Sequence, residues 1–145
     1  MEISDGHFFR LDHLRKAESV LAARAGRGEK VFTGAYVVPG VPGQSKPHSV
    51  CQLVTAVAAA APQVMSATMR GTWAALTLFD GLGSFLAGQV VADIAHLPCG
   101  RSWSDSGNWA PVGPGSARGI NRLLGRPKDK SVTQLEFEHL LAVLI

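Results

Sequence analysis

The chain has 145 residues, 17% of them charged, and a slightly positive mean hydropathy. These values are typical of one folded domain with a sizeable core, and they exclude a largely disordered chain. No apolar run approaches the roughly 20 residues of a membrane span, and no signal sequence opens the chain, so we expect a cytoplasmic protein without a membrane partner. Cys51 and Cys99 lack CxxC spacing, which argues against a metal site or a disulfide scaffold.

The net charge of +3 is unevenly distributed along the chain. Residues 101–130 contain six basic and two acidic residues, which gives this segment alone a charge of +4. A local basic field of this kind favours a polyanionic partner such as DNA, and a solvated basic surface is the alternative interpretation.

The first half of the chain predicts helices separated by one extended segment. Residues 11–25 have apolar side chains at helical spacing and are followed by Gly26, so we expect an amphipathic helix there. Residues 30–38 have a strand-like composition without a partner strand, and the Pro- and Gly-rich residues 39–43 predict a loop. Ser49 is a plausible N-cap for residues 50–61, which are apolar on nearly every face and predict a buried central helix.

Residues 66–96 have the pattern of a helix-hairpin-helix motif, with helices expected over 66–79 and 84–96. Gly81 and Gly83 allow the sharp turn between the helices because glycine reaches positive φ without a Cβ clash. The amides at the start of the second helix, including that of Ser84, are then free to bind a phosphate. Asp93 lies in this second helix among apolar residues. It is a candidate catalytic group, a partner for an arginine, or a solvent-facing charge.

Residues 101–115 are rich in Gly, Ser and Pro and predict an irregular active-site loop. Asp105 is the candidate catalytic carboxylate of this loop. Trp103 and Trp109 are candidates for stacking on a nucleobase, and the alternative is that both rings pack the loop onto the core.

A further helix is expected after this loop. Gly113 and Gly115 predict a tight turn, and Ser116 is the expected cap of the helix that follows. Arg118 and Arg122 lie four residues apart and therefore share one face of this helix, near a helix start that favours anions. We expect these five residues to contact phosphate. The predicted fold is thus mainly α, a single helical domain over residues 1–145 with no cofactor.

The hairpin followed by Asp105 resembles the helix-hairpin-helix DNA glycosylases, in which an essential aspartate follows the hairpin at a similar distance. Here Asp105 lies 22 positions after Gly83. The residues around Asp105 are closer to a phage-associated branch of that superfamily, the α-glutamyl/putrescinyl thymine pyrophosphorylases or amino acid:DNA transferases. The matching pieces are residues 31–36, 81–89, 90–93, Asp105 with Trp109, and 113–122. They correspond to the C-terminal half of such proteins, so we expect a shortened form.

The resemblance implies a reaction on modified thymine in double-stranded DNA, in the host cytoplasm. In that family 5-hydroxymethyluracil is first phosphorylated by a DNA base kinase, and the transferase then replaces the (pyro)phosphate with an amine from an amino acid or a polyamine. Asp105 or Asp93 would hold or deprotonate the amine, and Arg118 would bind the leaving phosphate. The base must leave the stack to react, and Trp109 or Trp103 would hold it.

Two alternatives stay open. The first is a DNA N-glycosylase in which Asp105 stabilises the oxocarbenium ion, although the usual glycosylase residues do not follow Asp105. The second is a non-catalytic DNA-binding module built on the hairpin.

Overall fold

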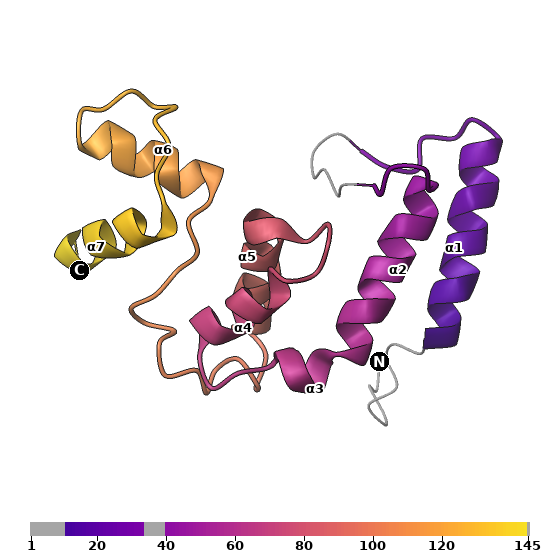
Figure 1. Ribbon diagram of the computed structural model, residues 1–145, viewed down its shortest axis with the longest axis horizontal. Helices are drawn as coiled ribbons and strands as arrows, with labels where there is room; N and C mark the ends of the chain where they lie inside the picture. Colours follow the sequence, from indigo (N-terminus) through magenta and orange to yellow (C-terminus); the bar gives the residue numbers. More distant parts are fainter. Residues whose placement is uncertain (1–10, 34–39, 145) are drawn as a thin grey trace. The chain divides into compact units, whose positions relative to one another are not determined.

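The computed structural model describes residues 11–33 and 40–144 of the chain (Figure 1). Seven α-helices and no strand lie in these ranges, which confirms the predicted mainly α fold. The segment with strand-like composition falls largely on residues 34–39, outside the described residues, and residues 30–33 form no regular element. Among the described helices, none has both the length and the hydropathy needed to cross a bilayer.

The chain divides into two compact units, residues 1–60 and residues 61–145, and each is described by itself. The single domain expected from the sequence stays a prediction. In its described residues, unit 1 has two helices, α1 (Leu11–Gly26) and α2 (Lys46–Ala59), which pack along each other. α1 has the predicted extent, and Glu29 just after it forms ion pairs of 2.7 Å with both Arg24 and Arg27.

α2 begins earlier than the sequence predicts. Ser45 is its N-cap, and the Ser45 hydroxyl accepts the amide hydrogen of His48 at 3.4 Å. Pro47 fits in the first turn because an amide there would have no acceptor within the helix. The prediction of Ser49 as the cap was therefore wrong. Ser49 is buried, and its hydroxyl accepts the Val41 amide hydrogen at 3.1 Å.

The prediction that α2 is buried on every side was also wrong. Its buried residues are Pro47, Ser49 and Cys51, whereas Val54 is 39% exposed. The physical reason is that unit 1 provides a single neighbouring helix, α1, so only one face of α2 can be covered within the unit.

Unit 2 contains the remaining five helices: α3 (Ala61–Val64), α4 (Met69–Leu76), α5 (Gly83–Ile94), α6 (Pro114–Leu123) and α7 (Gln134–Leu144). α4 and α5 pack against each other and form the predicted hairpin, with Leu76 and Val91 fully buried. The turn uses both predicted glycines, since Gly81 has a φ of 88° and Gly83 a φ of 53°.

α6 and α7 share a second buried cluster, made of Ile120, Val132 and Phe137. α6 begins at Pro114, with Gly113 as its N-cap in extended conformation. The expected cap, Ser116, instead lies in the first turn, where its hydroxyl accepts the Gly113 amide hydrogen at 2.9 Å. The earlier start follows from Pro114, whose fixed φ suits the first position of a helix.

Replacing the turn glycine tests the hairpin directly. A Cβ at Gly83 would meet no atom within 4 Å, so Gly83→Ala costs only backbone strain, about 1 kcal/mol of unfolding free energy. Gly119→Ala, also without a neighbour within 4 Å but inside α6, is the matched control and should stabilise by up to about 1 kcal/mol. Urea unfolding followed by tryptophan fluorescence measures both, because Trp73, Trp103 and Trp109 all lie in unit 2. Equal effects of the two substitutions would contradict the positive-φ turn.

Candidate functional site

Asp105 connects the loop of residues 101–113 to the start of α4. Its Oδ1 accepts the amide hydrogen of Met69 at 2.6 Å and its Oδ2 that of Arg70 at 3.0 Å. The Thr68 hydroxyl accepts the next amide hydrogen, that of Gly71, at 3.0 Å. The first amides of a helix have no acceptor within it, so these three bonds complete the α4 N-terminus, where a negative charge is also favoured by the helix dipole. Asp105 thus has a capping role in this structure, and its catalytic role stays a prediction.

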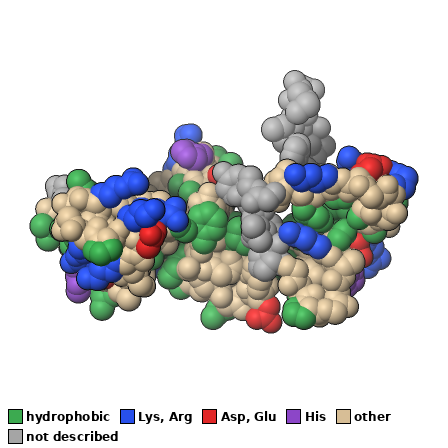
Figure 2. All heavy atoms as spheres, turned by 90° about the horizontal axis from the view of Figure 1, so that it is seen from above, with side chains coloured by type: hydrophobic (Ala, Val, Ile, Leu, Met, Phe, Trp, Pro, Cys, Tyr) green, Lys and Arg blue, Asp and Glu red, His purple; other side chains and the backbone are tan. Residues whose placement is uncertain are grey.

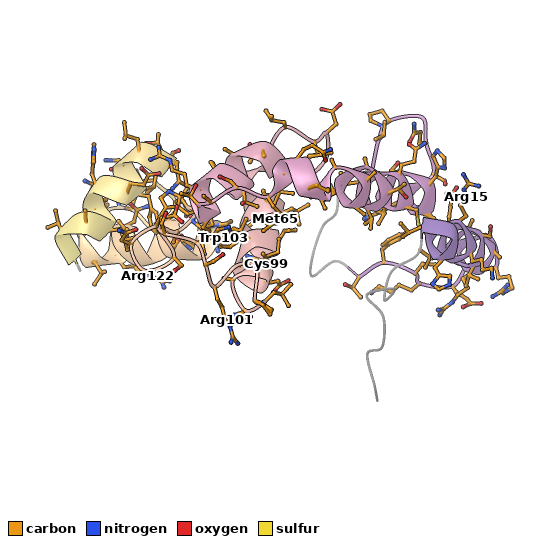
Figure 3. All side chains as sticks on the ribbon, turned by 90° about the horizontal axis from the view of Figure 1, so that it is seen from below. Arg15, Met65, Cys99, Arg101, Trp103 and Arg122 are labelled. Atoms are coloured by element: carbon orange, nitrogen blue, oxygen red, sulfur yellow. The ribbon has the colours of Figure 1, made fainter. Side chains whose placement is uncertain are left out.

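The two loop tryptophans are buried. Trp103 is 4% exposed and donates its indole N–H to the Ser66 carbonyl oxygen at 3.0 Å. In Figure 3 it lies within the fold, whereas Arg101 extends away from the ribbon. Trp109 donates to Glu138 Oε1 at 2.8 Å, and its ring centroid lies 5.6 Å from that of Trp73. Both rings therefore pack the loop onto the rest of unit 2. Their stacking on a displaced base stays a prediction.

Glu138 on α7 links three parts of unit 2. Its carboxylate accepts hydrogen bonds from Trp109 Nε1 at 2.8 Å and Gln134 Nε2 at 3.0 Å, and it lies 3.4 Å from an Arg70 guanidinium nitrogen. Burial by itself raises the pKa of this carboxyl. The two hydrogen bonds and the positive charges of Arg70 and His139 outweigh burial and bring the pKa below its ordinary value of 4.5. Glu138 is therefore ionised at neutral pH.

A surface cavity of about 520 Å³ opens beside this network, lined by Arg70, Asp105, Asn108, Trp109 and Ala142. The Arg70 side chain is 61% exposed and supplies a positive charge, while Asn108 supplies an amide and Trp109 an aromatic wall. This set of groups can hold a small anionic or polar group. Sequence analysis identified Asp105 and Trp109 in this cavity but missed Arg70.

The predicted phosphate contacts of the hairpin and of α6 partly meet in a second place. A groove of about 260 Å³ is lined by Ser84 and Phe85 at the start of α5 and by Gly113 and Pro114 at the start of α6, among others. No side chain caps the start of α5. Gly81 and Gly115 are not among the residues that line this groove.

Arg118 and Arg122 are exposed on α6, and their contact with phosphate stays a prediction. Arg118 Nε lies 3.8 Å from Asp129 Oδ1, and Lys128 Nζ lies 3.9 Å from Asp129 Oδ2. Asp129 thus lies near a cation of α6 and a cation of the loop that follows it. Figure 2 shows Lys and Arg side chains over α6 and α7, with an acidic side chain among them. We call Arg118, Arg122, Lys128 and Lys130 the basic surface.

Asp93 is exposed on α5 and does not line either of these two depressions. Its predicted catalytic role stays a prediction. The described residues contain no group of three or more His, Cys, Asp or Glu side chains suited to a metal ion.

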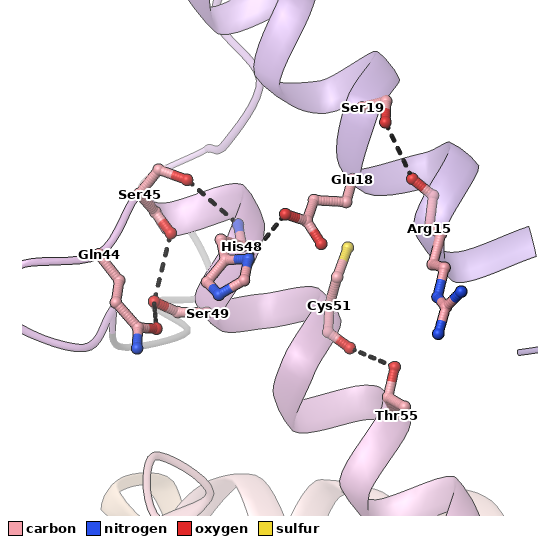
Figure 4. Close-up of polar contacts among 9 residues, drawn as sticks. All are labelled: Arg15, Glu18, Ser19, Gln44, Ser45, His48, Ser49, Cys51 and Thr55. Carbon is pink, nitrogen blue, oxygen red and sulfur yellow. Dashed lines mark hydrogen bonds and ion pairs between the residues drawn. The ribbon is translucent and has the colours of Figure 1, made fainter. Parts of the chain in front are cut away.

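Unit 1 has a cavity of its own, of about 540 Å³, between α1 and α2. Its polar wall includes Glu18 and His48, joined at 2.7 Å between Oε1 and Nδ1, with Arg15 and Cys51 nearby (Figure 4). Burial, and then the negative charge of Glu18, raises the pKa of the Cys51 thiol. Because the thiolate is the reactive form, Cys51 is not an activated nucleophile.

Removing the Asp105 carboxylate tests its capping role. Asp105→Ala leaves the Met69 and Arg70 amides without their acceptors and should cost about 1–3 kcal/mol of unfolding free energy. Asp105→Asn keeps one carbonyl acceptor and should cost less. Urea unfolding followed by tryptophan fluorescence gives both values. An Asp105→Ala protein as stable as the wild type would show that the cap contributes nothing.

The lowered pKa of Glu138 predicts that the stability of the folded protein depends on pH. Its pKa is lower in the folded protein, so its contribution is fully present above pH 4.5 and is lost as the pH falls through the folded value. Urea unfolding of the wild type and of Glu138→Gln at pH 7 and in more acidic buffer measures this contribution. The stability difference between the two proteins should shrink in acid. A difference independent of pH would contradict the lowered pKa.

A family model described as "5-hmdU DNA kinase, helical domain" matches residues 4–142. No curated protein and no solved structure matches the chain.

Proposed function

Since the chain belongs to the family of 5-hmdU DNA kinase helical domains, whose model spans nearly all of it, we propose that it holds DNA for an enzyme of thymine hypermodification. The observation that carries the proposal is the basic surface of α6 and the following loop. The family description names a kinase, so phosphorylation of 5-hydroxymethyluracil in DNA is the step that we assign to the enzyme.

The arrangement of the basic surface suits a DNA backbone. Arg118 and Arg122 project from one face of α6, and the contact of Asp129 with Arg118 brings the Lys128 loop to the same side. Arg118 is 57% exposed and Lys128 is 66% exposed, so both remain accessible to a large partner. Cations on phosphates release counterions from DNA, which gives binding that depends on salt and little on sequence. A domain that holds DNA for a base-modifying enzyme needs this kind of contact.

The cavity around Arg70 supports a second, smaller contact. An Arg70 guanidinium nitrogen forms an ion pair with Glu138 at 3.4 Å, but most of the Arg70 side chain is exposed. Arg70 can therefore also bind a phosphate at the mouth of the cavity. Asp105 and Trp109 hold the cavity wall in place through their bonds to α4 and α7.

Replacement of the phosphate by an amine, the step that the transferase resemblance implies, is the alternative within the same pathway. Both reactions need the same DNA substrate with a modified thymine, and they differ in the small molecule consumed. Mass spectrometry of nucleosides distinguishes them. Kinase chemistry requires a nucleoside triphosphate and yields phosphorylated 5-hydroxymethyluracil, whereas the transferase requires an amino acid or polyamine and yields an aminated nucleoside.

Charge changes on the basic surface test the proposed DNA contact in both directions. Arg122→Gln should weaken binding of a duplex and reduce the slope of log affinity against log salt by roughly one. Asp129→Asn removes the negative charge between Arg118 and Lys128 and should strengthen binding. Fluorescence anisotropy with a labelled duplex containing 5-hydroxymethyluracil, over a series of salt concentrations, measures both.

Lys16→Gln is the matched control, because Lys16 is an exposed cation on α1 in unit 1. It should change affinity less than Arg122→Gln. If both Arg122→Gln and Asp129→Asn bind DNA like the wild type, the basic surface does not contact DNA and the proposal fails.

A further inference from the structure

Several backbone hydrogen bonds hold the loop of residues 125–130 in one conformation. α6 ends in a Schellman motif, in which the Arg126 amide donates to the Asn121 carbonyl oxygen at 2.7 Å and the Gly125 amide to that of Arg122 at 3.2 Å. Gly125 takes the left-handed conformation that this motif needs, with a φ of 62°. The Lys130 amide donates to the Pro127 carbonyl oxygen at 3.0 Å and closes a second turn.

The Asn121 side chain fixes the rest of the loop. Its Nδ2 donates to the Lys130 carbonyl oxygen at 2.8 Å and, more weakly, to that of Lys128 at 3.4 Å. Asn121 is 0% exposed, and its Oδ1 has no hydrogen-bond partner in the structure. A buried amide with an unpaired oxygen costs stability, and an apolar side chain would avoid that cost. The benefit of an asparagine here is therefore the conformation of the loop.

That conformation decides where two cations point. Arg126 forms an ion pair with Glu136 within unit 2, so we do not count it among the cations that face a partner. Lys128 and Lys130 are exposed, and their carbonyl groups are the ones that Asn121 holds. On the side of the loop that faces α6, Asp129 Oδ1 lies 3.8 Å from Arg118 Nε.

We propose that the loop of residues 125–130 is a preformed phosphate-binding element for the DNA backbone, and that Asn121 is the positioning residue that sets it. The inference rests on the proposed function, since it states how the loop part of the basic surface is arranged for the same DNA. Arg118 and Arg122 approach the backbone from the helix, and Lys128 and Lys130 approach it from the loop. Because the loop is ordered before DNA arrives, binding does not have to pay its ordering entropy.

The test separates loop geometry from stability by comparing two substitutions of Asn121. Asn121→Leu removes both bonds to the loop but fills the buried site with an apolar side chain of similar shape and removes the unpaired Oδ1, so unit 2 should lose less stability than with Asn121→Ala, which leaves a cavity. It should nevertheless bind a duplex several-fold more weakly and with a shallower salt dependence. Asn121→Ala should lose stability as well as DNA affinity.

A double-mutant cycle tests whether Asn121 acts through the lysines. The Lys128→Gln/Lys130→Gln protein should lose affinity and about two units of salt slope. Adding Asn121→Leu to it should change affinity little, because the charges that Asn121 positions are gone. In an Arg101→Gln background, Asn121→Leu should keep its full effect. Additive losses in both backgrounds would overturn the positioning role.

Gly125→Val provides a second route if Asn121→Leu fails to fold, because a β-branched residue strongly disfavours the φ of 62° that the loop needs at this position. It should weaken DNA binding as Asn121→Leu is expected to. Arg122→Gln, measured in parallel, distinguishes the two possible failures. If Arg122→Gln weakens binding but the loop variants do not, the loop proposal is wrong. If none of them weakens binding, the proposed function is wrong as well.

Discussion

The Asp105 carboxylate at the N-terminus of α4 is the interaction on which unit 2 depends most. α4 has eight residues, too few to be a stable helix without tertiary contacts. Two of its first amides are satisfied from the loop 35 and 36 residues further along the chain. The Trp103 indole adds a bond to the Ser66 carbonyl oxygen just before α4. These bonds connect the loop to the hairpin. They bring Asp105 and Trp109 of the loop next to Arg70 of α4, where the three line the cavity.

Further polar contacts connect the same loop to the C-terminal helix α7. Glu138 accepts from Trp109, and the Gln134 side chain accepts the Val112 amide hydrogen at 2.8 Å and donates to the Ala110 carbonyl oxygen at 3.1 Å. α7 is thus held to the loop before α6, while the apolar cluster around Ile120 holds it to α6 itself. The two arginines of α6, Arg118 and Arg122, take no part in these contacts and stay exposed on the surface. Their exposed charge is consistent with the proposed contact to DNA.

Local sequence patterns predicted the elements better than their contacts. Periodicity and Gly81 and Gly83 were sufficient for the hairpin, because these signals depend on a few neighbouring residues. The caps Ser49 and Ser116 were placed wrongly because Ser45 and Gly113 compete for the same role, and adjacent prolines decide between them. Asp105 was singled out as a catalytic candidate, a role that stays a prediction. Its bonds to the start of α4 were not predictable, since nothing local indicates that residue 105 meets residue 69. Arg70, Glu138 and Asn121 were missed for the same reason.

The central claim is that this domain holds DNA through α6 and the loop after it. Amide hydrogen exchange of the whole chain, with and without a duplex containing 5-hydroxymethyluracil, tests it most directly. The account predicts slower exchange on DNA binding in α6 and residues 125–130, and little change in α1. Protection confined to α1 and α2, with α6 unchanged in the complex, would contradict it.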